Sequence, residues 1–332
     1  MKVADVLLVL VVAGGVVVGV ECSRAATAAP TKKSAFPIQG KPVSLVNPFP
    51  AGGTGDVVAR YEAPMLEKEW GIPVQVVNKP GAGGQAALTN LVTSNADGHT
   101  IAFATLPASI SIYLDPERKA VFGRKDLQPV ALHFVLPMAL AVRSDSPYHS
   151  LKDLVEAAKA RPQQIKMSTT GIMGVAHLGM LLLEKASGAK FAAVHFDGGP
   201  PATTALLGGH VDFQIVAISN YTPLVRAGQV RLLGIMDKNE SKFFPGVKTF
   251  EAQGYKGEMA TSQGWIVRAG TPMEVVDTLT AAAKKIMETE DYIKKLAEIG
   301  AEPRFMNAAD YAAYWDGLEA VVKQMMAENP QR

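Results

Sequence analysis

The sequence is poor in cysteine, with Cys22 as the single one among 332 residues. One thiol cannot build a disulfide framework or a cysteine-ligated zinc site, so the sequence excludes both. The six histidines are scattered and show no HExxH or paired spacing. We therefore expect no metal and no other cofactor.

An excess of one charge is also lacking. The chain has 33 Lys and Arg against 31 Asp and Glu, and it contains no Lys/Arg-rich run. Because sequence-independent affinity for nucleic acid depends on many basic contacts to phosphates, we expect no nucleic-acid partner. A G-x-S-x-G elbow and a P-loop lysine are missing as well, and no coherent set of acid, base and nucleophile appears, so we expect no enzyme activity.

The N-terminal residues 1–28 resemble a secretion signal. Residues 6–20 are almost wholly apolar, and small residues suited to cleavage follow at 24–30. The apolar run is shorter than the ~20 residues that a spanning helix needs. We therefore predict export with a cleaved signal. A lipid anchor at Cys22 is a less favoured alternative, because Glu21 precedes it where a small residue is preferred.

The rest of the chain alternates short apolar runs with helical patterns, which predicts an α/β fold with parallel strands. The predicted strands lie at 43–46, 74–77, 101–105, 138–142, 165–168, 211–216, 231–236 and 264–267. The clearest predicted helices lie at 150–160, 175–188 and 271–290.

About 300 residues exceed what one hydrophobic core usually serves, so we expect two lobes. No linker of biased composition separates them, which indicates that the chain crosses between the lobes more than once. The predicted division is 36–139 for the first lobe, 140–236 for the second and 237–329 for the return to the first. We expect the crossings at 138–142 and 231–236, with ligand in the cleft and closure by hinge motion.

A glycine-rich turn follows the first predicted strand in the stretch "PFPAGGTGDVVAR", residues 48–60. Glycines let the backbone approach a ligand closely, and the helix start beyond them directs unpaired N–H groups toward it. This pattern predicts an anion site. Two further strand, turn and helix units, at 167–178 and 196–209, repeat the arrangement.

A second glycine turn, Gly81 to Gly84 in "KPGAGGQAA", gives an alternative. Its Gly81-x-Gly83-x-x-Ala86 spacing is that of a dinucleotide-binding turn, so a nucleotide-dependent α/β enzyme remains a competing hypothesis. The helix after it brings no acidic residue to bind a ribose at the expected distance, apart from the loop residue Asp97. The match is therefore weak.

From Phe36 to Ala327 the chain resembles the extracytoplasmic solute receptors of tripartite tricarboxylate transporters, also called the Bug family. The motifs that carry this resemblance, all in family order, are "PFPAGGTGDVVAR", "NKPGAGG", "DGHTIAF", "LKDLVEAAKARPQQIKMSTTG", "HFDGGPPATTALLGGHVDF", "LVRAGQVRLLGI" and "AGTPMEVVDTL". The resemblance implies a two-lobe periplasmic-binding-protein fold, the Venus flytrap, with a ligand cleft between the lobes. It also implies capture of a small organic carboxylate and delivery to the membrane permease subunits of such a transporter. A receptor that serves a sensor is left open.

The resemblance implies that two turns hold a ligand carboxylate, largely through backbone N–H groups and hydroxyls. The expected binding residues are Phe49, Ala51, Gly52, Gly53, Thr54, Gly55, Asp56, Thr105, Pro107, Ser168, Thr169, Thr170, Gly171, Met173, His177, Asp197 and Gly198. The chain departs from the family at Gly55, where a hydroxyl residue is common, and at Asp197, where a lysine is common.

The three turns contain no Lys or Arg, so dipoles rather than an ion pair are expected to neutralise the anion. Ile172 and Met173, together with Leu106 and Pro107, add apolar surface, which leaves a second ligand charge poorly solvated. The sequence therefore predicts a preference for a carboxylate with an apolar or aromatic body over citrate-like acids.

Overall fold

The computed structural model describes residues 36–169, 174–196 and 199–329. These residues belong to a unit that spans Ser34–Arg332. The predicted secretion signal, the segment Thr170–Met173, and Asp197 with Gly198 lie outside the described residues.

Ten strands of the described residues form a sheet in the order β2-β1-β3-β9-β4-β7-β5-β6, and β10 and β8 also pair with β4. The strands are β1 (Val43–Asn47), β2 (Val74–Asn78), β3 (Thr100–Leu106), β4 (Leu127–Arg143), β5 (Lys166–Thr169), β6 (Ala192–His195), β7 (Phe213–Ala217), β8 (Val230–Ile235), β9 (Ala260–Arg268) and β10 (Glu302–Met306). Parallel pairing joins β1 with β2 and β3, and β5 with β6 and β7, whereas the pairs made by β4 and β9 are antiparallel. The predicted α/β class is confirmed, and the expected parallel strands are present, but the sheet as a whole is mixed.

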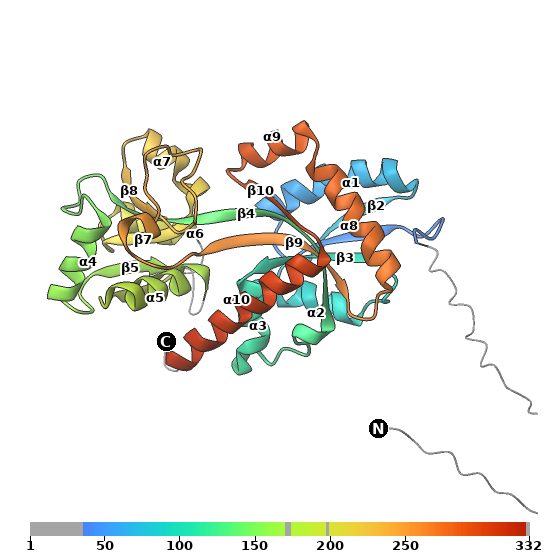
Figure 1. Ribbon diagram of the computed structural model, residues 1–332, viewed down its shortest axis with the longest axis horizontal. Helices are drawn as coiled ribbons and strands as arrows, with labels where there is room; N and C mark the ends of the chain where they lie inside the picture. Colours follow the sequence, from blue (N-terminus) through green and yellow to red (C-terminus); the bar gives the residue numbers. More distant parts are fainter. Residues whose placement is uncertain (1–35, 170–173, 197–198, 330–332) are drawn as a thin grey trace, which may run out of the picture. The chain divides into compact units, whose positions relative to one another are not determined.

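Strand β4 changes partners halfway along its length. Residues Leu127 to Pro137 pair with β9, and residues Met138 to Arg143 pair with β7 and β8. Figure 1 shows β4 and β9 running between the group of β1, β2 and β3 and the group of β5, β7 and β8. The partner change lies beside the predicted crossing at 138–142, while the division into lobes stays a prediction.

Helices cover both faces of the sheet (Figure 1). Their bounds are α1 (Thr54–Trp70), α2 (Gln85–Thr93), α3 (Ala108–Leu114), α4 (Leu151–Ala160), α5 (Val175–Ser187), α6 (Gly199–Leu207), α7 (Thr222–Arg226), α8 (Met273–Met287), α9 (Glu290–Glu298) and α10 (Ala308–Glu328). Short 3-10 turns include η1 (Ala82–Gly84) and η2 (Pro116–Arg118). Alternate residues of one strand enter different cores, as expected from the twofold side-chain period: Phe103 packs with α1 and α8, and Ala104 packs with α2 and α10.

Two parts of the secondary structure differ from the sequence prediction. The helix expected over 271–290 is α8 and ends earlier, at Met287, because Thr289 caps the start of a further helix, α9, through its hydroxyl. Strand β10 was not predicted, and neither was the part of β4 from Leu127 to Pro137; the strand expected to open the unit at 196–209 is β6, which ends just before it. The alternating, partly exposed pattern of β10 and the four-residue length of β6 give each only a weak apolar signal.

A polar cluster is buried beside the core that contains Phe103 and residues of α1 and α8. The Glu62 carboxyl group of α1 accepts hydrogen bonds from Trp265 Nε1 at 3.1 Å and from the Tyr292 hydroxyl at 3.0 Å. His133 Nδ1 of β4 lies 2.8 Å from the same carboxyl group. All four side chains are fully buried. Burial, reinforced by the Glu62 charge, raises the pKa of Tyr292 well above its usual range. The cluster ties α1, β4, β9 and α9 together.

Candidate functional site

A cavity of about 470 Å³ opens at the ends of β1, β3 and β9. Its described lining residues are Phe49, Gly53, Thr54, Gly55, Gly83, Thr105, Leu106, Pro107, Ala108, Ser111, Ile112, Arg118, Leu136, Gly174, Val175, Thr261 and Gln263. The carboxyl ends of parallel strands are the usual ligand site of an open α/β sheet. The size suits a small molecule.

The first wall is the turn between β1 and α1. Gly52 has a φ of +85°, a conformation that favours glycine, and its N–H donates to the Asp56 carboxylate at 2.9 Å. Arg60 Nε donates to the same oxygen at 3.0 Å. The Arg60 hydrogen bond is the main cause of a lowered Asp56 pKa. Asp56 therefore shapes the turn from behind, and the start of α1 at Thr54 lies on the cavity wall.

Gly55 is where the helix approaches its neighbours most closely. A Cβ atom at this position would lie 2.5 Å from Asn47 Oδ1 and 3.1 Å from Gln263 Oε1. No larger residue fits without displacing these side chains. This contact explains why the chain has glycine at a position where the resemblance leads one to expect a hydroxyl.

Two buried amide side chains flank Gly55. Asn47 Nδ2 donates to the Phe49 carbonyl at 2.9 Å, and Gln263 Nε2 donates to the Thr105 hydroxyl at 3.3 Å. Within the described residues, Asn47 Oδ1 and Gln263 Oε1 have no hydrogen-bond donor. Since buried polar atoms are normally paired, these two oxygens indicate a place for a ligand or for ordered water. Gln263 is 4% exposed and lines the cavity, and its unpaired oxygen lies beside Gly55, another lining residue.

The second helix start on the wall is that of α5. Gly174 is its N-cap residue and, with Val175, lines the cavity. Glycine has no side chain to cap the helix, and Gly53 occupies the same place before α1. Both helices are longer than three turns, and the first N–H groups of a helix have no intrahelical acceptor. Two positive helix ends therefore meet one cavity.

A third contribution is the guanidinium of Arg118 from η2. It is the one ionisable side chain among the described lining residues. The predicted turns contain no Lys or Arg, but this residue enters from a different part of the chain. The cavity thus combines helix ends, hydroxyl groups and one full positive charge.

The structure separates the predicted site residues into four groups. Those on the cavity wall are Phe49, Gly53, Thr54, Gly55, Thr105 and Pro107. Those that form the turn behind the wall without lining the cavity are Ala51, Gly52 and Asp56. Those that are buried near the start of α5 but are not lining residues are Ser168, Thr169 and His177. Those outside the described residues are Thr170, Gly171, Met173, Asp197 and Gly198.

Sequence reasoning missed part of the wall. The missed residues are Gly83, Ala108, Ser111, Ile112, Arg118, Leu136, Thr261 and Gln263. A polar residue in the middle of the otherwise apolar run of β9 was the one available signal for Gln263. No sequence signal indicated Arg118, because this residue lies in the charged segment "DPERK", which is typical of an ordinary exposed loop.

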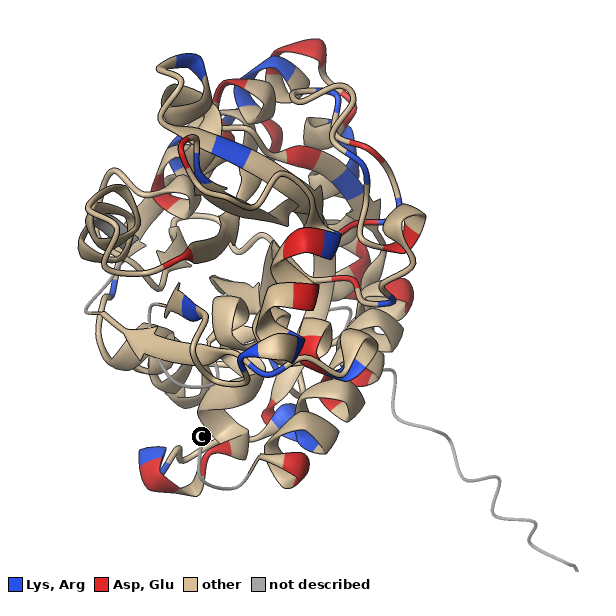
Figure 2. Ribbon diagram, turned by 90° about the vertical axis from the view of Figure 1, so that its left-hand side faces the viewer, with Lys and Arg blue, Asp and Glu red and all other residues tan. Residues whose placement is uncertain are grey.

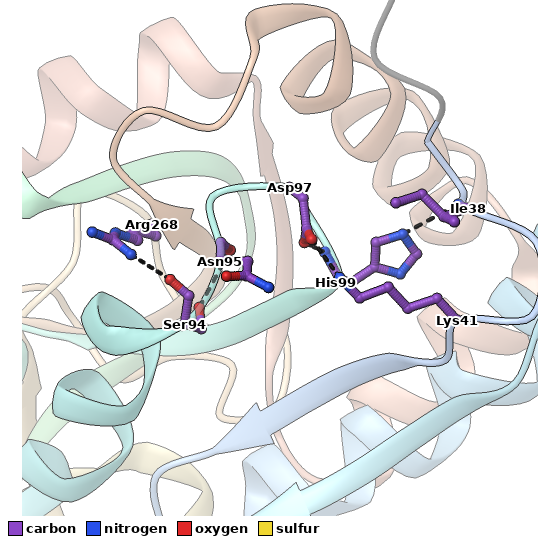
Figure 3. A network of polar contacts seen from close by, with 7 residues as sticks. All are labelled: Ile38, Lys41, Ser94, Asn95, Asp97, His99 and Arg268. Carbon is purple, nitrogen blue, oxygen red and sulfur yellow. Dashed lines mark hydrogen bonds and ion pairs between the residues drawn. The ribbon is translucent and has the colours of Figure 1, made fainter.

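A second hollow of about 410 Å³ lies at the opposite ends of β1 and β3. Figure 3 shows its polar residues bonded to one another: Ile38 N donates to His99 Nε2 at 3.2 Å, and Lys41 pairs with Asp97. Asp97 also accepts from His99 N at 3.0 Å. Burial is the largest influence on the His99 imidazole and lowers its pKa. These contacts attach the segment after residue 36 to the sheet. The polar residues of this hollow therefore have a structural role, and we do not take the hollow as a candidate ligand site.

Charges of both signs are interspersed over the helices (Figure 2). Among the described residues no group of three or more His, Cys, Asp or Glu is arranged to hold a metal ion. No helix within that same part of the chain is both long and apolar enough to cross a bilayer.

Comparison with known proteins gives a family match over residues 58–327, to the tripartite tricarboxylate transporter family receptor. The protein BugT of Bordetella pertussis is 30% identical over 290 residues, which cover 86% of this chain and 88% of BugT.

Solved structures agree with this match. A TctC solute binding protein from Polaromonas, determined without ligand, has a TM-score of 0.77 and 26% identity, and covers 87% of this chain and 99% of its own. An R. palustris protein determined with adipate has a TM-score of 0.73 and 26% identity, with coverage of 87% and 98%. The predicted periplasmic-binding-protein fold is thereby confirmed.

Proposed function

The chain belongs to the tripartite tricarboxylate transporter receptor family, whose members are periplasmic solute-binding receptors, and from this premise we propose that it captures a small organic carboxylate in the cavity. The observation that carries the proposal is the meeting of two glycine-capped helix starts, α1 and α5, on one wall. Backbone N–H groups at helix starts bind anions without further charge. The adipate held by the R. palustris relative is a ligand of this chemical class.

Binding rather than reaction is the role that the cavity supports. Its lining combines neutral hydroxyl, amide and apolar groups with one arginine, which is not a set of acid, base and nucleophile. The family is one of solute-binding receptors rather than enzymes. The Gly81–Gly84 turn, the basis of the nucleotide hypothesis, packs beside Arg118.

The receptor would deliver its ligand to the membrane permease subunits of a tripartite tricarboxylate transporter. Export with cleavage of residues 1–28, without a lipid on Cys22, would place it where such a permease is reached. Intact-mass measurement on a periplasmic extract tests export, with a mature N-terminus expected between Ala25 and Thr31. A mass that retains Met1 or includes a lipid on Cys22 contradicts it.

Ligand capture is proposed to close the 36–139 and 237–329 segments onto 140–236, since each helix start alone offers only one turn of donors. Small-angle scattering with and without a saturating ligand is expected to show compaction. An unchanged radius of gyration at saturation argues against closure.

The binding role itself is tested with a ligand panel. Thermal-shift measurements with mono-, di- and tricarboxylates, aromatic acids and amino acids are expected to identify at least one carboxylate that raises the melting temperature by mass action. Calorimetry then compares Thr54→Val with Thr278→Val, an exposed threonine on α8 far from the cavity. The first is expected to weaken the carboxylate by about 1 kcal/mol or more, and the second to leave it unchanged. A protein that binds no carboxylate in the panel refutes the proposal.

A further inference from the structure

The Gly81–Gly84 turn has a structural partner that the sequence did not reveal. The carbonyl of Ala82 accepts a hydrogen bond from Arg118 Nη1 at 3.1 Å. Gln85, which begins the helix after the turn, donates through Nε2 to the Arg118 carbonyl at 3.1 Å. The turn therefore holds this arginine at both its side chain and its backbone.

The shape of the turn depends on this contact. Gly83 has a φ of +66°, and a Cβ there would lie 3.5 Å from Arg118 Nη1. Ala82 has a φ of +46°, which is uncommon for a residue with a side chain, and its carbonyl is the one that accepts from Arg118. An irregular turn of this kind persists when the surrounding contacts hold it in place. The result is a guanidinium whose position is fixed before ligand arrives.

The arginine keeps donors available for a ligand. A guanidinium has five N–H donors, and Ala82 uses one of them. Asp115 lies 3.5 Å from Nε and is about as exposed as Arg118, at 36% against 34%. However, Asp115 does not line the cavity, and its other oxygen caps η2 by accepting from Glu117 N at 3.0 Å. The Asp115 carboxylate thus lies beside Nε, and Nη1 donates to Ala82. Arg118 and Gly83 both line the cavity.

We propose that Arg118, held by the Gly81–Gly84 turn, is a specificity-determining residue that binds a second acidic group of the ligand. The inference rests on the proposed function, in which the helix starts of α1 and α5 hold the first carboxylate. Pairing of a guanidinium with a carboxylate is among the stronger hydrogen-bonded contacts in proteins. Apolar wall residues such as Ile112, Leu136 and Val175 suit a methylene chain between the two acidic groups. The site then selects dicarboxylates over monocarboxylates of the same length.

Matched pairs of acids test this selection. Calorimetric titration of the purified mature protein compares succinate with butyrate, glutarate with valerate, and adipate with hexanoate. Arg118→Gln is expected to weaken the best dicarboxylate about tenfold or more, which corresponds to about 1.4 kcal/mol, and to change its matched monocarboxylate little. Arg226→Gln, on the exposed side of α7, removes the same charge far from the cavity and is expected to change neither acid. Arg118→Lys is expected to retain part of the selection.

A second variant acts in the opposite direction. Asp115→Asn frees the guanidinium from its competing carboxylate and is expected to tighten the dicarboxylate. It also keeps an oxygen that can accept from Glu117 N, so η2 keeps its cap. Raised salt is expected to weaken the dicarboxylate more than the monocarboxylate, because one more charge pair is screened.

The outcomes separate this inference from the proposed function. If the wild type binds no carboxylate, the proposed function fails and takes the inference with it. If the wild type binds both acids of a pair equally, or if Arg118→Gln weakens both acids of a pair by the same factor, the carboxylate receptor stands and the second acidic subsite is overturned.

Discussion

Helix α1 contacts strand β9 at two places along its length, and the two differ in how their polar groups are paired. We call the contact of Gly55 with Gln263 the open level and the contact of Glu62 with Trp265 the sealed level. At one level Gly55 lies against Gln263, and at the other Glu62 accepts from Trp265. Gly55 and Glu62 are two helical turns apart, and Gln263 and Trp265 lie on the same face of β9. The two levels thus use the same pair of elements and the same faces.

At the sealed level, that of Glu62, the carboxyl group is fully paired, although His133 Nε2 has no partner among the described residues; at the open level, that of Gly55, two amide oxygens are unpaired within the same part of the chain. Glu62 has three partners from three other elements. In contrast, no donor among the described residues reaches Asn47 Oδ1 or Gln263 Oε1. Unpaired buried acceptors cost free energy, so such groups are kept where a ligand or water completes them. The difference is that the Glu62 carboxyl group is paired within the core, whereas the unpaired oxygen of Gln263 belongs to a residue that lines the cavity.

The largest expected effect is on stability and comes from removing the carboxyl group of Glu62. Glu62→Ala leaves the Trp265 and Tyr292 donors buried without an acceptor, and removes the partner of His133. We expect a loss of about 3–5 kcal/mol in the free energy of unfolding, measured by urea denaturation. Glu62→Gln keeps one acceptor oxygen and should lose less. Ligand affinity of the molecules that remain folded should not change, and a selective loss of binding would contradict the structural role.

The fold was largely predictable because its signals are local. Strands such as β1 and β3 are short, mostly apolar runs followed by a glycine or proline turn. The exchange of partners along β4 was not predictable, since the sequence predicts a strand only over 138–142 and nothing local indicates where pairing changes along residues 127–143. The mixed strand directions follow from this long strand.

The site was predictable only where it is made of backbone. The turn at 51–56 is visible in its glycines, because glycine has a local conformational reason to be there. Gln263 and Arg118 join the cavity through long-range contacts, with Thr105 and with Ala82 respectively, and such contacts leave no spacing to read in the sequence. The expectation that no charged side chain lines the site was therefore based on only part of the residues that line the cavity.

The next largest effect comes from adding a side chain at Gly55, where the open level leaves little space. In Gly55→Ala the new Cβ meets Asn47 Oδ1 at 2.5 Å, so we expect a destabilisation of about 1–3 kcal/mol and weaker carboxylate binding. The same substitution at Gly317 on α10, where a Cβ meets nothing within 4 Å, should stabilise by roughly 0.5–1 kcal/mol. Thermal and urea unfolding measure both. Equal signs for the two variants would show that the close approach at Gly55 is not the deciding contact.

A smaller effect separates binding from stability at the open level. Gln263→Leu keeps an approximately equal volume but removes the unpaired acceptor and the hydrogen bond to Thr105. We expect carboxylate affinity to fall by about 1 kcal/mol, roughly fivefold, with a similar or smaller change in stability. Gln75→Leu on the exposed side of β2 is the control and should leave affinity unchanged. If Gln263→Leu behaves like its control, the open level is only an imperfectly packed part of the core.

The smallest expected effect concerns the pH dependence of the turn that supports the open level. The Arg60 hydrogen bond holds the Asp56 pKa below its ordinary value of 3.8, so the folded state binds this proton less readily than the unfolded chain does. The resulting stabilisation is complete above about pH 3.8 and is lost as the pH falls through the lowered pKa of the folded state. Arg60 is 56% exposed, and solvent screens the pair, so the contribution should stay below about 1 kcal/mol. Urea unfolding of the ligand-free protein at neutral pH and near pH 3 measures it against Asp56→Asn, which cannot titrate. The loss of stability on acidification should be smaller in the variant, and an identical loss would mean that the Gly52 and Arg60 contacts do not depend on the charge of Asp56.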